Sequence, residues 1–204
     1  MRTLLSTALL GLLLAAAGPA PAGDAAAAAT AATATPALPG ESLYHLQATL
    51  TDQHGQSLQW SALQGRPQLV SMFYANCHLM CPLILENAKL LQKQLPAAER
   101  ERLDVAIITL DPARDSPAAL AELAQRHRAP EDWRFLRPAT DDVRALANVL
   151  DVSYRFREDG SINHTSALVL LDAQGRILAR SEVVGAAPDP AFLQQVRTAL
   201  AAAD

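Results

Sequence analysis

The chain has 204 residues and a formal net charge of -4, and half of its residues are hydrophobic. It contains no run of lysine or arginine with interleaved aromatic residues, which argues against a nucleic-acid partner. Its two cysteines are too few for a disulfide-stapled scaffold, and after an N-terminal region about 165 residues suffice for one domain with its own core.

The N-terminal segment has the pattern of a secretory signal. Arg2 is positively charged, residues 4–17 are apolar, and residues 20–22 (Ala-Pro-Ala) provide small side chains for cleavage. The apolar run is shorter than the roughly 20 residues that a membrane-spanning helix needs. Residues 1–22 are therefore predicted to be a signal peptide, with an N-terminal membrane anchor as the alternative, and the protein is expected to be exported to the periplasm, close to the membrane.

Residues 23–40 consist mainly of Ala, Thr and Pro, with Asp24 as their one charge. Such a composition lacks a hydrophobic period that could pack against a core, and it is typical of a flexible tether. The folded domain is therefore predicted to span residues 41–204.

Apolar runs bounded by turn residues predict the strands of this domain. A β-hairpin is expected first, with strands at 46–50 and 58–60 around a turn at 52–55. The remaining strands are expected at 68–74, 104–110, 133–136, 152–156, 166–171 and 177–184. Residues 172–175 (Asp-Ala-Gln-Gly) predict that the last two strands form a hairpin.

Helical spacing of apolar residues predicts four helices, at 82–95, 117–128, 141–150 and 190–203. Pro82 suits a first helical position, and Ser116 before Pro117 is typical of a helix cap. Strands that alternate with helices, followed by a hairpin and a helix, favour an α/β fold with a mixed sheet covered by helices on both faces. This order is that of a thioredoxin-like fold with an extra N-terminal β-hairpin.

The stretch 73–82, FYANCHLMCP, holds both cysteines, Cys77 and Cys81. A pair of thiols in an exported chain can form a structural disulfide, a redox couple or a pair of soft metal ligands. A disulfide that closes so small a loop would stabilise the fold by only about 2 kcal/mol. At the turn between a strand and a helix, the positive end of the helix is expected to lower the thiol pKa and favour thiolate, the form that attacks disulfides and binds metal.

The spacing of the cysteines bears on the choice between redox chemistry and metal binding. Dithiol oxidoreductases usually carry two residues between their cysteines, whereas three lie between Cys77 and Cys81, a wider gap that suits chelation of one ion. Two thiolates suit Cu(I), and an added imidazole would also allow Cu(II). The candidate is His164, in the polar segment INHTS that precedes a predicted buried strand; the alternative is a surface histidine that caps this strand.

The remaining histidines are expected to be solvated side chains. His45 and His54 lie in or beside the first predicted hairpin. His127 lies in the last turn of a predicted helix, where the helix dipole favours a cation.

In combination, FYANC-HLM-CP, TLDPARDSP, WRFL and NHTSALVLLD resemble the Sco/SenC family of membrane-facing copper proteins, in order and spacing. The resemblance covers residues from about 46 to the C-terminus. It implies a thioredoxin-like domain that binds one copper ion through two cysteines and a distant histidine, here Cys77, Cys81 and His164. Members of the family deliver copper to the binuclear copper centre of cytochrome c oxidase, or reduce its thiols.

The resemblance also bears on the residues after the second central strand. Asp111, Pro112, Arg114 and Asp115 match a loop of the family, and the two carboxylates are expected to orient Arg114 or to cap the next helix. Between the cysteines the chain departs from the family, because His78 and Leu79 stand where many relatives have proline and an acidic residue.

The residues between the cysteines add two copper-binding side chains, the His78 imidazole and the Met80 thioether. His78 is an optional extra ligand, with an exposed side chain as the alternative. Met80 is expected to pack inward as a core residue.

Three functions follow as hypotheses. The first is a copper metallochaperone, without turnover of its own, for an oxidase subunit or another periplasmic copper protein. The second is an exported thiol:disulfide oxidoreductase in which Cys77 and Cys81 are the catalytic redox pair, and it requires a thiol reductant. The third is an interaction module with a retired site.

Overall fold

The computed structural model of the protein describes residues 37–77, 80–183, 185 and 187–202. The predicted signal peptide, most of the predicted tether and His78 lie outside the described residues. Among the described residues, no helix combines the length and apolarity needed to cross a bilayer.

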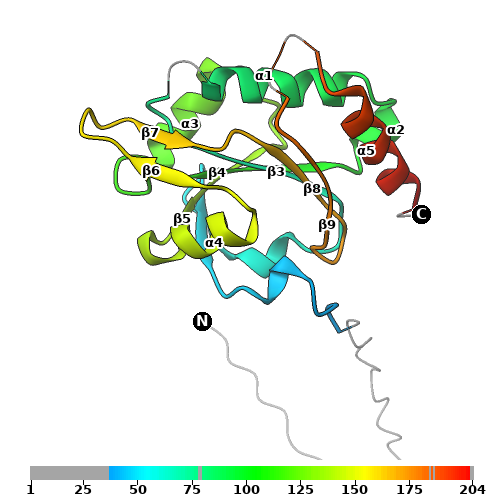
Figure 1. The fold of residues 1–204 in the computed structure, drawn as a ribbon, viewed down its shortest axis with the longest axis horizontal. Coiled ribbons are helices and arrows are strands. Elements are labelled where there is room, and N and C mark those ends of the chain that lie inside the picture. Colours follow the sequence, from blue (N-terminus) through cyan, green and yellow to red (C-terminus); the bar gives the residue numbers. More distant parts are fainter. Residues whose placement is uncertain (1–36, 78–79, 184, 186, 203–204) are drawn as a thin grey trace, which may run out of the picture. The chain divides into compact units, whose positions relative to one another are not determined.

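The described residues form nine strands. They are β1 (Thr49–Asp52), β2 (Ser57–Gln59), β3 (Gln68–Phe73), β4 (Asp104–Thr109), β5 (Arg134–Pro138), β6 (Tyr154–Phe156), β7 (Ile162–His164), β8 (Leu168–Leu171) and β9 (Ile177–Ser181). Seven of them form a mixed sheet in the order β2-β1-β5-β4-β3-β8-β9, in which β3, β4 and β5 are parallel (Figure 1). Strands β6 and β7 pair antiparallel as a separate ribbon.

The helices lie on both faces of this sheet. They are α1 (Met80–Lys93), α2 (Ala97–Arg100), α3 (Pro117–Arg126), α4 (Val143–Val149) and α5 (Pro190–Ala202), with short 3-10 helices η1 (Leu43–His45), η2 (Trp60–Leu63) and η3 (Thr140–Asp142). Figure 1 shows α1 and α5 on one side of the sheet and α4 on the other. The predicted fold class, a mixed sheet flanked by helices with an N-terminal hairpin, is confirmed.

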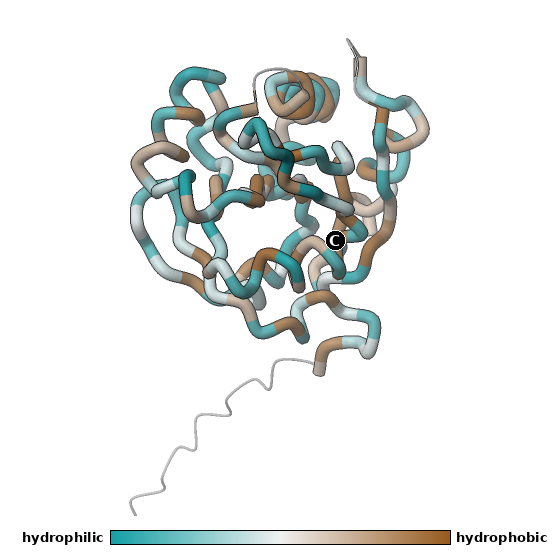
Figure 2. Tube along the Cα trace, turned by 60° about the vertical axis from the view of Figure 1, so that its left-hand side comes forward, coloured by the Kyte–Doolittle hydropathy of each residue, from teal (hydrophilic) through white to brown (hydrophobic). Residues whose placement is uncertain are grey.

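The two central strands of the sheet, β3 and β4, are buried on both faces. All six residues of β3 are buried, and β4 is buried along all but its first residue. Strands covered on both faces read as continuous hydrophobic runs rather than as alternating ones. Figure 2 shows hydrophobic stretches where the chain passes through the interior. This buried pair ends at the edge where the cysteines follow β3.

Several element boundaries differ from the predictions. The first hairpin starts at Thr49 rather than 46. Before it lies η1, whose cap Ser42 accepts a hydrogen bond from the backbone N–H of Tyr44. The helix predicted from Pro82 begins two residues earlier, at Met80. Proline is tolerated there because N–H groups of a first helical turn have no intrahelical acceptor. The predicted cap at Ser116 is confirmed, since its side chain accepts from the N–H of Ala119.

The environment of His127 is the reverse of the one expected. At the carboxyl end of α3, the Lys89 ammonium donates a hydrogen bond to the backbone carbonyl of His127 at 2.7 Å. Partial burial, and then the charges of Lys89 and Arg126, lower the pKa of His127 below its usual 6.5. A neutral imidazole is therefore favoured in the folded protein, and the sequence-based expectation of a cation is wrong.

This shift predicts a pH dependence of stability. Below about pH 6.5 the unfolded chain protonates at His127 before the folded protein does, so the free energy of unfolding should fall as pH decreases through this window. In the variant His127→Gln the free energy of unfolding should fall less between pH 7.5 and pH 5.5 than in the wild type. Urea unfolding at the two pH values would measure this difference. His54→Gln, in the exposed β1–β2 turn, is the control. An unchanged pH response in His127→Gln would contradict the prediction.

Candidate metal centre

The two thiols lie at the carboxyl end of central strand β3. Cys77 is half-buried in the turn that follows β3, and Cys81 is 2% exposed in the first turn of α1, both as thiols. The backbone N–H of Cys81 donates to the Cys77 sulfur at 3.3 Å. This hydrogen bond holds the Cys77 sulfur next to the first turn of α1, which carries Cys81.

The thiolate expectation is wrong for Cys81. The hydrogen bond with the Cys77 side chain, followed by burial, raises the pKa of Cys81 above its usual value. The positive end of a helix favours a thiolate, but a buried anion beside a second sulfur is opposed more strongly. A metal ion bound here would have to displace this proton, so metal binding would release protons.

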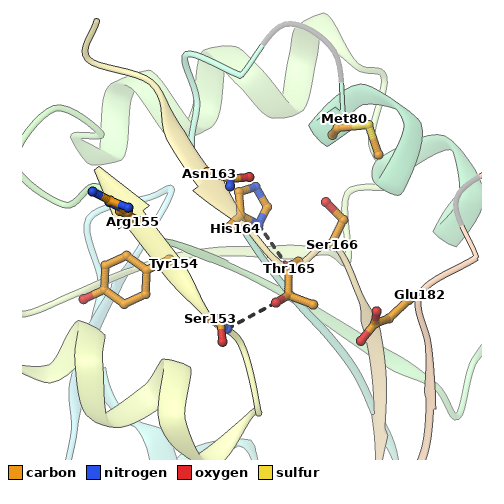
Figure 3. Close-up of a pocket in the computed structure, with 9 residues that line it drawn as sticks. All are labelled: Met80, Ser153, Tyr154, Arg155, Asn163, His164, Thr165, Ser166 and Glu182. Carbon is orange, nitrogen blue, oxygen red and sulfur yellow. Dashed lines mark hydrogen bonds between the residues drawn. The ribbon is translucent and has the colours of Figure 1, made fainter. Parts of the chain in front are cut away.

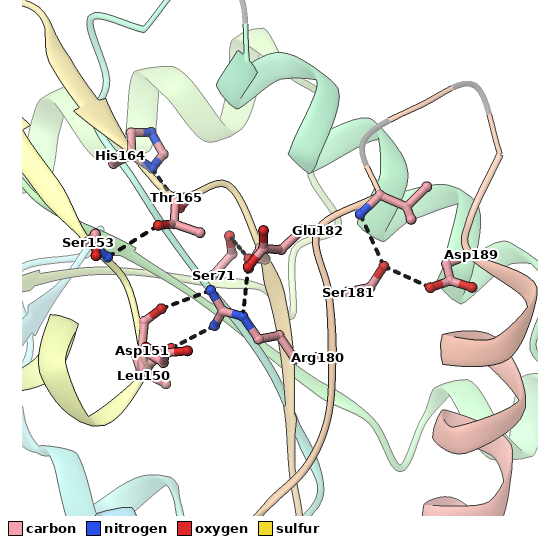
Figure 4. Close-up of polar contacts among 12 residues, drawn as sticks. Ser71, Leu150, Asp151, Ser153, His164, Thr165, Arg180, Ser181, Glu182 and Asp189 are labelled. Carbon is pink, nitrogen blue, oxygen red and sulfur yellow. Dashed lines mark hydrogen bonds and ion pairs between the residues drawn. The ribbon is translucent and has the colours of Figure 1, made fainter.

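His164 is placed by strand β7 rather than by the loop that the sequence predicted. It is the last residue of β7, opposite Tyr154 in the β6–β7 ribbon. Its backbone neighbour Thr165 and Ser153 exchange hydrogen bonds, from Thr165 N–H to the Ser153 carbonyl at 2.9 Å and from Ser153 N–H to the Thr165 hydroxyl at 3.3 Å (Figure 4). These bonds fix the end of the ribbon that carries the imidazole.

The hydrogen bonds of the imidazole determine which ring nitrogen faces the thiols. Nδ1 of His164 lies 3.0 Å from the Thr165 carbonyl oxygen, which can only accept, so Nδ1 carries the proton. In the neutral ring the lone pair then lies on Nε2, which is 3.8 Å from the Cys81 sulfur. The ring of Tyr74 packs edge-on against the imidazole, with centroids 5.9 Å apart.

The side chains of Cys77, Cys81 and His164 therefore form one donor group. Their two sulfurs and one nitrogen all lie within 4.8 Å of one another. Bonds of about 2.3 Å to sulfur and about 2.0 Å to nitrogen would let one metal ion contact a sulfur and a nitrogen atom that lie up to about 4.3 Å apart. The observed 3.8 Å between Cys81 and His164 fits this arrangement. Two thiols and a neutral imidazole suit a thiophilic first-row ion.

Met80 does not pack into the core, so that prediction is wrong. Its side chain is 37% exposed at the start of α1. It lines a cavity of about 650 Å³ with His164 and Ser166 (Figure 3). It also lines a smaller one of about 300 Å³ with Cys77 and His164. At the first residue of α1 the thioether thus lies at the open side of the donor group. His78, the optional extra ligand, lies outside the described residues.

The loop after β4, residues 111–115, contacts the turn that carries Cys77. The Asp115 carboxylate, 3% exposed, accepts hydrogen bonds from the Ala75 N–H at 2.9 Å and from the Thr109 hydroxyl. Burial is the main cause that raises the pKa of Asp115. Asp111 orients Arg114 as expected, but Asp115 supports the cysteine turn instead of capping α3. The sequence contains no local sign of this contact, because Asp115 and Ala75 are 40 residues apart.

Comparisons of the sequence give a family match and curated relatives. A family model described as SCO1/SenC matches residues 39–200. A protein of Stutzerimonas stutzeri, provisionally named a copper-binding protein, is 30% identical over 135 residues, covering 64% of this chain and 65% of that protein. A SCO1 protein homolog of Bacillus subtilis is 26% identical over 157 residues, covering 74% of this chain and 80% of the homolog. The match thus spans slightly less than two thirds of the Stutzerimonas protein.

Solved structures share the fold. ScoI of Bradyrhizobium japonicum with copper bound gives a TM-score of 0.62 at 21% identity, covering 74% of this chain and 97% of ScoI. Yeast Sco1 with copper bound gives 0.61 at 21% identity, covering 75% of this chain and 86% of Sco1. These likenesses confirm the thioredoxin-like fold. Because the family model spans nearly all of the described residues, the chain belongs to the SCO1/SenC family.

Proposed function

We propose that this protein is a copper metallochaperone that binds one copper ion, Cu(I) or Cu(II), through the thiols of Cys77 and Cys81 and the imidazole of His164. The observation that supports this most directly is the approach of the three donor atoms to within 4.8 Å, with the Nε2 lone pair of His164 facing the thiols. The related ScoI and yeast Sco1 have been solved with copper bound. In this role copper is cargo, and the protein needs no turnover.

The recipient that we propose is the oxidase subunit that carries the binuclear copper centre of cytochrome c oxidase. The related BsSco is described as a member of the Sco family of cytochrome c oxidase assembly proteins. We further propose that residues 1–22 direct export to the periplasm or anchor the chain there, and that residues 23–40 tether the domain of residues 41–204 near the membrane. Half-burial of Cys77 and His164 leaves the donor group accessible to a partner.

The first test is a titration of the reduced full chain with Cu(I) under anaerobic conditions. We expect one equivalent to bind, because two thiolates are soft ligands that select Cu(I). The matched control is Cys77→Ser/Cys81→Ser, which keeps the size of both side chains and should bind none at the same affinity. Equal binding by the wild type and this double variant would disprove the proposal.

A thiol:disulfide oxidoreductase is the second candidate. It is favoured by the hydrogen bond between Cys81 N–H and the Cys77 sulfur, which brings the two thiols together, and by the disulfide switch identified in the related BsSco. This activity would not require an imidazole. Reduction of a disulfide substrate by His164→Ala at the wild-type rate, with no copper binding by either protein, would favour this function over the metallochaperone.

A further inference from the structure

The proposed ligands come from two separate sheets. The cysteines follow β3 of the main sheet, whereas His164 ends β7 of the two-stranded ribbon. No strand pairing among the described residues joins the ribbon to the main sheet. The distance between thiols and imidazole therefore depends on the short link from β7 to β8, on the packing of Tyr74 against the imidazole, and on side-chain contacts to the ribbon. The segment 111–115 makes such contacts to both sides.

One contact of this segment holds the cysteine turn. The Asp115 carboxylate accepts from the N–H of Ala75, two residues before Cys77, and from the Thr109 hydroxyl at the end of β4. Asp115 is 3% exposed, so this bond is shielded from competing water. The turn that carries Cys77 is thus tied to the end of the neighbouring strand.

The other contact holds the ribbon. Nε of Arg114 donates to the Asp111 carboxylate, and Nη2 donates to the backbone carbonyl of Gly160 at 2.7 Å. Gly160 lies in the turn between β6 and β7 and has a φ of +78°. A Cβ at Gly160 would lie 3.3 Å from Nη1 of Arg114, so the guanidinium packs closely against this turn.

The ribbon contacts the rest of the domain near both of its ends. The bonds between Ser153 and Thr165 extend the ribbon's own strand pairing past His164 (Figure 4). There the ring of Tyr74 packs against the imidazole, whereas Arg114 holds the tip at Gly160. The Asp111 side chain is 6% exposed, and its ion pair with Arg114 orients the Arg114 guanidinium. Without Arg114 the tip would keep the ribbon's own backbone bonds and lose its link to the segment 111–115.

We infer that Arg114 is a positioning residue that holds the His164 ribbon over the thiols, and that it thereby controls the binding of Cu(II) much more than that of Cu(I). This inference rests on the proposed copper site. Two thiolates alone can hold Cu(I), and their spacing is set by the cysteine turn and α1. Cu(II) requires the harder imidazole nitrogen as well, so it depends on where the ribbon places His164.

The test compares the two oxidation states of copper in Arg114→Ala and in the control Arg157→Ala. Arg157 lies in the same ribbon turn, but its side chain is 61% exposed and pairs with Asp159 of that turn rather than with the segment 111–115. Arg114→Ala should lower the Cu(II) affinity by about 10- to 100-fold, as is typical when a group that orients a ligand is removed. It should also weaken the sulfur-to-copper charge-transfer absorption. Its Cu(I) affinity, and both affinities of Arg157→Ala, should match the wild type.

A double-mutant cycle with His164→Ala tests the route of the effect. If Arg114 acts by placing His164, Arg114→Ala should cause no further loss of Cu(II) affinity in the His164→Ala background. Additive losses would overturn the inference. If Arg114→Ala does not fold, Arg114→Lys provides the same comparison, since it keeps the charge but lacks the second nitrogen needed to bridge Asp111 and Gly160.

The outcomes also separate this inference from the proposed function. If the wild type binds Cu(I) and Cu(II) and Arg114→Ala lowers both affinities equally, or neither, Arg114 does not control the third ligand and the inference alone fails. If the wild type binds neither ion better than Cys77→Ser/Cys81→Ser, the proposed function fails and the inference fails with it.

Discussion

Replacing His164 by alanine is expected to lower the affinity for Cu(II) by at least about 100-fold, because even groups that only orient a ligand contribute about 10- to 100-fold. The Nε2 atom of His164 lies 3.8 Å from the Cys81 sulfur and is the nitrogen donor of the group. Cu(I) binding by the reduced protein should persist, since two soft thiolates can hold that ion alone. Titration with each ion and the charge-transfer spectrum of the Cu(II) form would measure the difference.

The matched control for this prediction is His54→Ala, which removes an exposed imidazole from the β1–β2 turn. Added imidazole should restore part of the charge-transfer absorption in His164→Ala, because the cavity beside Met80 and Ser166 is open to a small ligand. Cu(II) binding by His164→Ala at the wild-type affinity would exclude His164 as a ligand. In that case His78→Ala becomes the variant that identifies the nitrogen donor.

Replacing Gly175 by alanine is expected to destabilise the fold by between about 2 and 5 kcal/mol. Gly175 has a φ of +82°, and a left-handed backbone costs an L-residue about 1–2 kcal/mol. A Cβ here would also come within 2.5 Å of the ring of Tyr44. Tyr44 is 1% exposed and packs against Trp60, so it cannot move without disturbing the core, and such overpacking costs about 1–3 kcal/mol.

The matched control is Gly55→Ala. Gly55 also lies in a hairpin turn, with a φ of +80°, but nothing lies within 4 Å of a Cβ added there. It should therefore lose only the backbone term of about 1–2 kcal/mol. Urea unfolding of the two variants would measure both changes, and a loss in Gly175→Ala no larger than that in Gly55→Ala would contradict the contribution of the Tyr44 contact.

The sequence alone determined the fold class and the members of the donor group. Nearly continuous apolar runs predicted β3 and β4, because a strand buried on both faces is largely hydrophobic rather than alternating. Ser116 before Pro117 predicted the start of α3, because capping is a local interaction. Chemistry and spacing selected Cys77 and Cys81, and the resemblance to the family supported His164 as the third member. The structure brings their donor atoms within 4.8 Å of one another.

Only the tertiary structure decided how these residues are held. His164 belongs to strand β7, which is too short and too polar to show a strand pattern, and it meets Cys81 across 83 residues of sequence. The raised pKa of Cys81 arises from its hydrogen bond with the Cys77 side chain and then from burial. Met80 is exposed because α1 begins at this residue, two positions before the predicted start. The bridge from Arg114 to Gly160 spans 46 residues. Contacts between distant segments determine such features, and no local pattern of residues encodes them.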